Sequence, residues 1–171
     1  MIILLTFIFK IYYLFFGFEC ADLGIRVMED KLLEINWEDL KRAAVEAAAG
    51  SYSKYSGFVV GAAVLAKNGQ IYTGTNVENA AYGVGLCAEC GAISDMVKDG
   101  QALQLVAAIA ILLKRDGEVV VITPCGRCRQ LLFEHGGAGA LVWSPKFEKP
   151  LDMDYWLPEG FGSDSLKLLA V

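Results

Sequence analysis

Two short cysteine segments constrain the fold of this chain more than any other feature. Residues 86–90 (LCAEC) and 123–128 (TPCGRC) each hold a pair of thiols, Cys87 with Cys90 and Cys125 with Cys128, and 34 residues separate the pairs. Each segment lies where we expect a helix to begin, and the unpaired N–H groups and the dipole of a helix N-terminus favour thiolate over thiol. A fold that joins two such ends can hold a soft or borderline cation, for which zinc is the default.

The hydrophobic pattern predicts alternating helices and strands around these segments. We expect helices at 37–49, 86–98, 125–135 and 164–169, and strands at 58–66, 71–77, 103–114, 119–122, 141–143 and 150–153. Periodicity alone does not distinguish a buried strand from a helix at 103–114, but a helix precedes this segment and a turn follows it, which favours a strand. The order of elements predicts an α/β layered sandwich with helices on both faces of one sheet.

The charge balance and the cysteine count narrow the function classes. The chain has 15 basic and 20 acidic residues and a net charge of −5, so it lacks the basic surface that holds a phosphate backbone, and we expect no nucleic-acid partner. Hydrophobic residues make up 55% of the chain, which is enough to build a core. The five cysteines, an odd number, fit metal ligands or catalytic thiols better than a disulfide framework. We therefore expect a reducing, cytoplasmic location.

Residues 1–27 form an apolar N-terminal extension to the domain that we expect at 28–171. Residues 1–20 contain seven of the 19 aromatic side chains, with Lys10 and Glu19 as their only charges. A helix of residues 1–18 would be about 27 Å long, as a membrane anchor requires, but Lys10 would then lie near the bilayer centre at a cost of roughly 2.5–3.5 kcal/mol. The basic start and small-residue end of a signal peptide are absent. We prefer a true start at Met28, and expect no membrane contact except through residues 1–20.

Two less specific interpretations of the cysteines remain open. Four thiolates would make a closed structural zinc site, although the 34 residues between the pairs exceed the roughly 15–20 typical of such fingers. A thioredoxin-like redox pair at Cys125 and Cys128 is the second, and it would leave Cys87 and Glu89 without a role.

We favour a catalytic zinc with three thiolate ligands, Cys87, Cys125 and Cys128, and an open fourth position. Glu89 lies two residues after the first ligand, so it can project beside the metal and transfer protons as a general acid–base. The ordinary alternative for this glutamate is a solvated position on the helix surface. The spacing C-x-E…P-C-x-x-C favours the catalytic role, because it is close to the established signature of zinc nucleobase deaminases.

At these residues the chain resembles the cytidine deaminases of the small, homotetrameric type, whose zinc ligands are all cysteines. The resemblance extends from about Trp37 to Leu166, and includes residues 55–63 (YSGFVVGAA), 76–82 (NVENAAY) and 157–162 (LPEGFG) as well as the zinc segments. It implies a three-layer α/β/α sandwich around a mixed five-stranded sheet and one zinc ion per subunit. The implied activity is the hydrolytic deamination of free cytidine and deoxycytidine in pyrimidine salvage.

The resemblance also implies six substrate-binding residues outside the metal ligands: Phe58, Asn76, Glu78, Tyr82, Ala88 and Phe161. Asn76 and Glu78 would hydrogen-bond the ribose 3′-hydroxyl. Phe58 would pack on the pyrimidine, and the backbone N–H of Ala88 would reach the base carbonyl. Phe161 would enter the pocket of a neighbouring subunit, so the tetramer would share its active sites. From the residues alone, both phenylalanines suit a core or an interface equally well.

One position departs from the family pattern. Many relatives of this type carry Arg where this chain has Cys90, and that Arg is thought to offset the charge of three thiolates, which with Zn²⁺ sum to −1. Arg127 or Arg129 can replace it, together with the two helix dipoles, unless they are simple surface charges. We expect Cys90 to be a buried spectator or a neighbour of the ligands rather than a ligand.

Three other functions share part of the pattern. A blasticidin-type deaminase has the same zinc motifs, but the ribose contact implied for Glu78 favours an ordinary nucleoside. A nucleic-acid-editing deaminase needs a basic channel, which a net charge of −5 does not suggest. A non-enzymatic zinc-binding module would hold zinc tightly and release no ammonia.

Overall fold

The computed structural model describes residues 34–167, so the extension at 1–27 and the start at Met28 lie outside the described residues. The elements are α2 (Trp37–Ala48), β1 (Val59–Ala66), β2 (Ile71–Thr75), η2 (Tyr82–Val84), α3 (Ala88–Lys98), β3 (Leu105–Leu113), β4 (Val119–Ile122), α4 (Gly126–Gly136), β5 (Leu141–Ser144), β6 (Lys149–Asp152), α5 (Met153–Trp156) and α6 (Ser163–Lys167). Within residues 34–167, no helix has the length and apolar character needed to cross a bilayer.

One mixed sheet forms the centre of the fold. Its strand order is β2-β1-β3-β5-β6, and β4 pairs with β3 outside this path. β1 is antiparallel to β2 and β3, whereas β3 and β5 are parallel. β4 and β5 share one edge of β3, because β4 pairs with residues 110–113 and β5 with residues 107 and 108. The resemblance implied five strands, but the sheet has six, because β4 pairs with the end of β3 outside the five-strand path β2-β1-β3-β5-β6.

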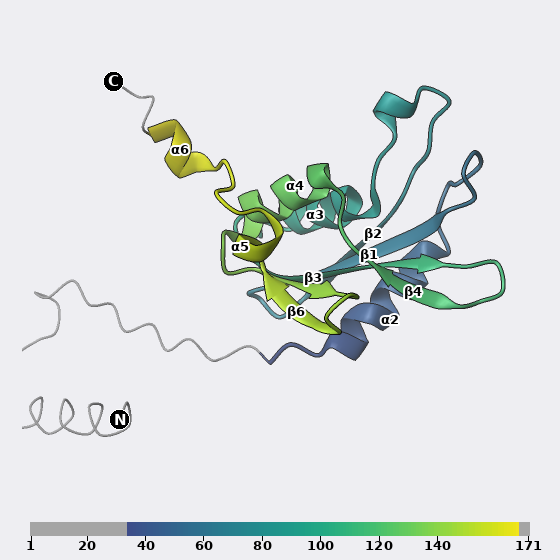
Figure 1. The fold of residues 1–171 in the computed structure, drawn as a ribbon, viewed down its shortest axis with the longest axis horizontal. Coiled ribbons are helices and arrows are strands. Elements are labelled where there is room, and N and C mark those ends of the chain that lie inside the picture. The colour runs from purple at the N-terminus through teal and green to yellow at the C-terminus, as the bar shows by residue number, and fades with distance from the viewer. Residues whose placement is uncertain (1–33, 168–171) are drawn as a thin grey trace, which may run out of the picture. The chain divides into compact units, whose positions relative to one another are not determined.

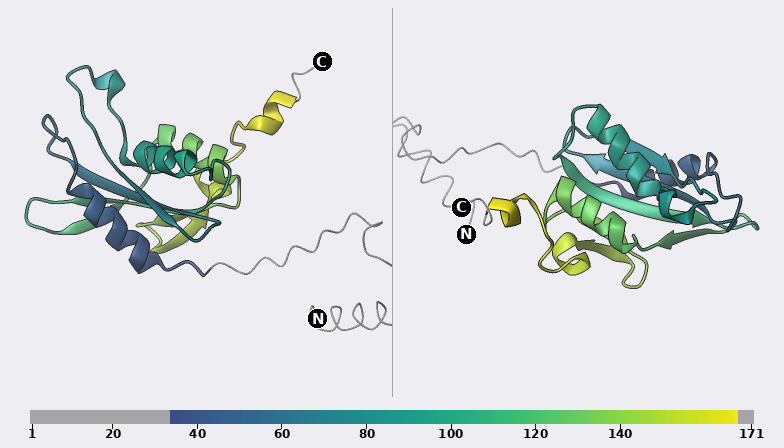
Figure 2. Two further views of the ribbon diagram at one scale, coloured as in Figure 1. Left: turned by 180° about the vertical axis from the view of Figure 1, so that it is seen from behind. Right: turned by 90° about the horizontal axis from the view of Figure 1, so that it is seen from above.

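Helices cover both faces of this sheet, as Figures 1 and 2 show, so the expected three-layer α/β arrangement is confirmed. α2 lies on one face, where it packs against Ala63 and Leu65 of β1. α3 and α4 lie side by side on the other face, and their core includes Val64 and Ala66 of the same strand. The apolar segment at 103–114 forms β3, a strand that is buried between the two helix layers.

Two glycines let the helices lie directly on the sheet backbone. A Cβ atom at Gly61 would lie 1.9 Å from the Ala44 carbonyl oxygen of α2, and one at Gly74 would lie 2.3 Å from the Ala88 carbonyl oxygen of α3. A larger residue does not fit at such a close backbone approach. Gly74 thereby sets the distance between β2 and the first turn of α3, which carries Glu89.

Two short helices have no counterpart in the sequence pattern. η2 has three residues and α5 has four, which is too short for a helical period to be recognised. The loop that carries η2 projects from the body of the fold (Figure 1). α5, in contrast, buries Met153 and Trp156 in the core that it shares with α4.

Candidate metal centre and active site

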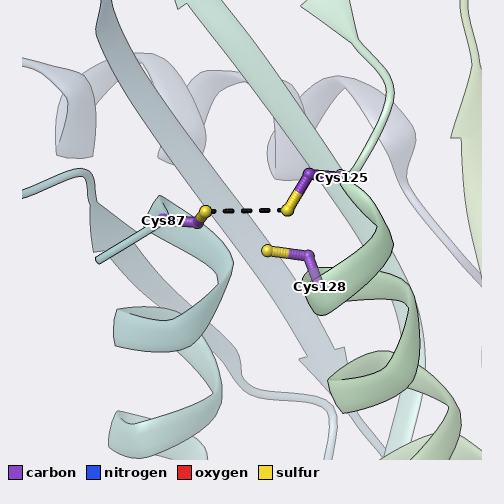
Figure 3. A group of neighbouring side chains, drawn as sticks. All are labelled: Cys87, Cys125 and Cys128. Atoms are coloured by element: carbon purple, nitrogen blue, oxygen red, sulfur yellow. Dashed lines mark hydrogen bonds between the residues drawn. The ribbon is translucent and has the colours of Figure 1, made fainter. Parts of the chain in front are cut away.

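The N-termini of α3 and α4 bring three cysteine thiols together. Cys87 is the N-cap of α3, Cys125 is the N-cap of α4, and Cys128 lies in the first turn of α4. The Cys87 thiol makes no cap hydrogen bond to the backbone of its own helix, and backbone N–H groups in the first turn of α4 stabilise the thiolate form of Cys125. The three Sγ atoms lie within 4.8 Å of one another and point toward a common centre (Figure 3). The structure therefore assembles the three ligands that the spacing predicted.

This donor set fits zinc. Two thiolates bound tetrahedrally to one Zn²⁺ with Zn–S bonds of about 2.3 Å would have sulfur atoms about 3.8 Å apart. The Sγ atoms of Cys87 and Cys125 are 3.7 Å apart. Within residues 34–167, Cys90 is not part of the group, so the structure does not support the closed four-cysteine site. Participation of Cys87 also distinguishes the group from a two-cysteine redox pair.

The thiol pKa values correct one expectation from the sequence. We expected both helix N-termini to favour thiolate, but burial raises the pKa of Cys87 to about 11 and also raises the pKa of Cys128. The negative charge of nearby Glu89 adds to the increase at both thiols. At Cys125 burial also acts to raise the pKa, but hydrogen bonds from Cys128, Cys87 and the Arg127 backbone together outweigh it, and the pKa is lowered. A bound cation is therefore needed to make all three thiols thiolates near neutral pH.

A cavity of about 490 Å³ opens beside the thiols. Its volume lies within the range of roughly 300–1,000 Å³ that small-molecule sites occupy. The lining includes the ligands Cys87 and Cys125 and the expected acid–base Glu89. It also includes five of the six expected substrate-binding residues: Phe58, Asn76, Glu78, Tyr82 and Ala88. Glu89 is buried, with 6% of its surface exposed. Phe161 does not line the cavity of its own chain and is 56% exposed.

Glu78 is held as a hydrogen-bond acceptor at the rim of this cavity. Its carboxylate accepts bonds from the backbone N–H of Tyr55 (2.7 Å) and of Ser56 (3.2 Å) and from the Ser56 hydroxyl. The Ser56 hydroxyl and the Tyr55 N–H hold the pKa of Glu78 below its ordinary value. The same Ser56 oxygen accepts a bond from the N–H of Phe58 (2.9 Å), so it connects two of the expected substrate contacts.

The Asn76 amide is oriented by the segment before β1 and by β1 itself. Its Oδ1 accepts bonds from the Ser51 hydroxyl (2.6 Å) and the Val60 N–H (2.9 Å), and its Nδ2 donates to the Phe58 carbonyl (2.8 Å). One N–H of the amide is left for a ligand. Sequence reasoning missed Ser51 altogether, because no motif marks it. It included Ser56 only as part of the quoted segment 55–63.

The two arginines proposed to offset thiolate charge bind backbone carbonyls. Arg127 donates to the Gly85 carbonyl (3.3 Å), and Arg129 donates to the carbonyls of Pro124 (3.1 Å) and Trp156 (3.3 Å). Within the described part of the chain, neither guanidinium hydrogen-bonds a cysteine thiol. Any compensation of charge by these arginines therefore acts through space and not through a direct bond.

An open three-thiol centre with a buried carboxylate beside it is the arrangement that a zinc-dependent hydrolytic deaminase requires. Comparison with known proteins identifies the protein family more narrowly. The family model described as "Cytidine and deoxycytidylate deaminase zinc-binding region" matches residues 35–144, and the chain belongs to this family. The resemblance read from the motifs and the expected zinc cofactor are both confirmed.

Mycobacterial proteins are among the most similar relatives. The chain is 43% identical over 133 residues to the cytidine deaminase of Mycobacterium tuberculosis, and the match covers 78% of this chain and 95% of that one. The crystal structure of the M. tuberculosis cytidine deaminase matches with a TM-score of 0.68 and 42% identity, covering 75% of this chain and 99% of that chain. That of the Mycobacterium leprae cytidine deaminase matches with a TM-score of 0.66 and 44% identity, covering 74% and 100%.

Proposed function

We propose that this protein hydrolyses free cytidine and deoxycytidine to uridine and deoxyuridine, with release of ammonia, and that residues 28–171 form the catalytic domain. The observation that carries the proposal is the position of Glu89. Its carboxylate is buried, lines the ligand-sized cavity and lies close enough to Cys87 and Cys128 to raise their pKa values, yet it is not among the clustered metal donors. A carboxylate in that position is suited to proton transfer rather than to metal binding.

Each residue of the centre has a defined part in the reaction. Cys87, Cys125 and Cys128 hold zinc, which when bound lowers the pKa of a water molecule and supplies a nucleophile near neutral pH. Glu89 accepts the proton of the water that attacks C4 of cytosine and donates a proton to N3. It then carries a proton to the departing amine, so that water and cytidine become uridine and ammonia.

The remaining cavity residues favour a neutral nucleoside. Glu78 is committed as an ionised acceptor, which suits a sugar hydroxyl donor, and the free N–H of Asn76 can donate to the same hydroxyl. Phe58 presents its ring at the cavity with 62% of its surface exposed, as a stacking partner for the base requires. Among the side chains that the structure describes, no Lys or Arg lines the cavity, which favours a neutral nucleoside over a nucleotide.

We also infer a homotetramer with shared active sites in a cytoplasmic location. Large apolar side chains around the cavity mouth are exposed, among them Tyr55, Tyr82 (83% exposed) and Leu86, as expected of a surface that a second copy covers. The backbone of exposed Phe161 is held by a bond from the Gln130 amide to its carbonyl (2.7 Å), and its side chain is accessible to a second copy. Light scattering of the zinc-loaded protein tests the tetramer.

The decisive assay follows ultraviolet absorbance as cytosine is converted to uracil. The zinc-loaded full chain should convert cytidine and deoxycytidine and release one ammonia per nucleoside, and zinc removal by a chelator should abolish the reaction. Blasticidin S, cytidine 5′-monophosphate and a cytosine-containing single-stranded DNA should react at least 100-fold more slowly. Tightly bound zinc with no ammonia release would overturn the proposal in favour of a zinc-binding module. Preference for one of the other substrates would replace the substrate class.

A further inference from the structure

The first turn of α4 has an unusual charge distribution. It contains two arginines, Arg127 and Arg129, and no acidic residue. Positive charge at a helix N-terminus is unfavourable, because the helix dipole is positive there. Of the side chains described by the structure, no carboxylate is a partner of either arginine, since the ion pairs are those of Arg42, Lys98 and Lys114. Another interaction must therefore offset the cost of placing two cations at this helix end.

Arg129 connects the loop before Cys125 to a fixed point in the core. Its Nε donates to the Pro124 carbonyl (3.1 Å) and its Nη1 to the Trp156 carbonyl (3.3 Å), while the guanidinium lies 5.1 Å from the centre of the Trp156 ring. Trp156 is itself only 6% exposed and donates its indole N–H to the Val142 carbonyl of β5 (3.4 Å). The peptide group just before a zinc ligand is therefore tied to the sheet.

Arg127 makes the equivalent connection on the other side of the metal centre. It lies between the ligands Cys125 and Cys128, and its Nη1 donates to the Gly85 carbonyl (3.3 Å), two residues before Cys87. The two side chains thus leave one helical turn in different directions. Each reaches a backbone carbonyl immediately upstream of one of the two ligand-bearing helix N-termini.

We propose that Arg127 and Arg129 are positioning residues for the metal ligands. Arg127 ties the N-terminus of α4 to the Gly85 carbonyl before α3, and Arg129 fixes the Pro124 peptide, just before Cys125, to Trp156. Their contribution to zinc binding is geometric, and the positive charge is secondary. A planar guanidinium can bridge two carbonyls and stack on an indole at once, which an ammonium group cannot do. The proposal rests on the zinc centre and not on the reaction, so its failure leaves the proposed deaminase activity untouched.

Two substitutions of Arg129 distinguish geometry from charge. Arg129→Lys keeps the positive charge and loses the guanidinium, whereas Arg129→Gln loses both. The zinc dissociation constant of the full chain is measured by competition with a chromogenic chelator for the wild type, Arg129→Lys and Arg129→Gln. We expect both variants to bind zinc about tenfold more weakly than the wild type. Arg42→Lys, in an exposed ion pair on α2, is the matched control and should stay within twofold of the wild type. A role of charge alone predicts that Arg129→Lys resembles the wild type while Arg129→Gln is weak, and a loss below fivefold in Arg129→Lys overturns the proposal.

A spectroscopic measurement tests the geometry without enzymatic turnover. Cobalt(II) bound in place of zinc has d–d absorption bands that depend on the arrangement of its ligands. We expect these bands to shift or broaden in Arg129→Lys and not in Arg42→Lys, and bands identical to the wild type in both would contradict the proposal. If Arg129→Lys does not fold, as judged by circular dichroism, the exposed Arg127→Lys decides. It should weaken zinc binding at least threefold and alter the cobalt bands, and wild-type values would overturn the proposal.

Discussion

Replacing Gly74 with alanine should damage the metal centre through the backbone, without touching a ligand. A Cβ atom at this position would lie 2.3 Å from both the Ala88 carbonyl oxygen and the Ala92 nitrogen. Ordinary contacts begin near 3.4 Å, so α3 must move away from β2 by roughly 1 Å. This shift moves Cys87 and Glu89 together, because both belong to the N-terminal end of α3, whereas the two ligands on α4 stay in place.

The size of the effect follows from that displacement. Forcing a methyl group into a packed contact costs about 1–3 kcal/mol of unfolding free energy. A misplacement of about 1 Å at reacting groups reduces a catalytic rate by about 100-fold. A movement of this size is also large against the 3.7 Å between the sulfur atoms of Cys87 and Cys125. We therefore expect Gly74→Ala to bind zinc at least about tenfold more weakly and, when loaded, to deaminate cytidine about 100-fold more slowly.

Two other glycine substitutions separate this effect from a general loss of stability. Gly61→Ala places its Cβ even closer to a backbone atom, 1.9 Å from the Ala44 carbonyl oxygen. It displaces α2, however, which lies on the opposite face of the sheet. It should lower the free energy of unfolding while the folded protein keeps its zinc affinity. Gly139→Ala has no atom within 4 Å of its Cβ and should change neither quantity. Urea unfolding measures stability, chelator competition measures zinc affinity, and the ultraviolet assay measures the rate of deamination. Equal zinc affinity in Gly74→Ala and Gly61→Ala would refute the reasoning.

Three further predictions concern individual polar groups. Cys90→Ala should keep zinc content and activity within about twofold, and loss of the metal would restore the four-thiol site. Zinc affinity measured between pH 6 and 8 should rise by at least about 100-fold per pH unit, because the raised pKa values of Cys87 and Cys128 mean that binding displaces at least two protons; a rise below tenfold would contradict those protonation states. Ser56→Ala removes a donor to Glu78 and should raise the KM for cytidine about tenfold with a smaller change in kcat, whereas an unchanged KM would separate Glu78 from substrate binding.

Local sequence signals were sufficient for most of the fold and for the metal ligands. The Asn68-Gly69 pair predicts the β1–β2 hairpin, which forms with a three-residue loop in which Gly69, with a φ of 81°, takes the left-handed position. The all-apolar segment that became β3 was resolved by its neighbours along the chain. The three cysteines that cluster in the structure could be selected because the spacing C-x-E…P-C-x-x-C is chemically specific.

Properties that depend on tertiary contacts could not be read from the chain. Burial outweighs the helix N-terminus at Cys87 and Cys128, and the depth of a thiol is known only once the layers are assembled. The bond between Ser51 and Asn76 joins residues 25 positions apart with no motif to connect them. The carbonyl partners of Arg127 and Arg129 were equally hidden, because backbone acceptors leave no trace in a sequence.

The most direct test of the account is the activity of Glu89→Gln at known zinc content. The substitution keeps the size of the side chain and removes its ability to accept a proton, so zinc should remain at one ion per chain while cytidine deamination falls by about 100- to 10,000-fold. Glu46→Gln, at an exposed position on α2, is the matched control and should behave like the wild type. A Glu89→Gln protein that retains both zinc and full activity would contradict the role of this carboxylate in proton transfer. Loss of zinc from the same variant would instead make Glu89 part of the metal site.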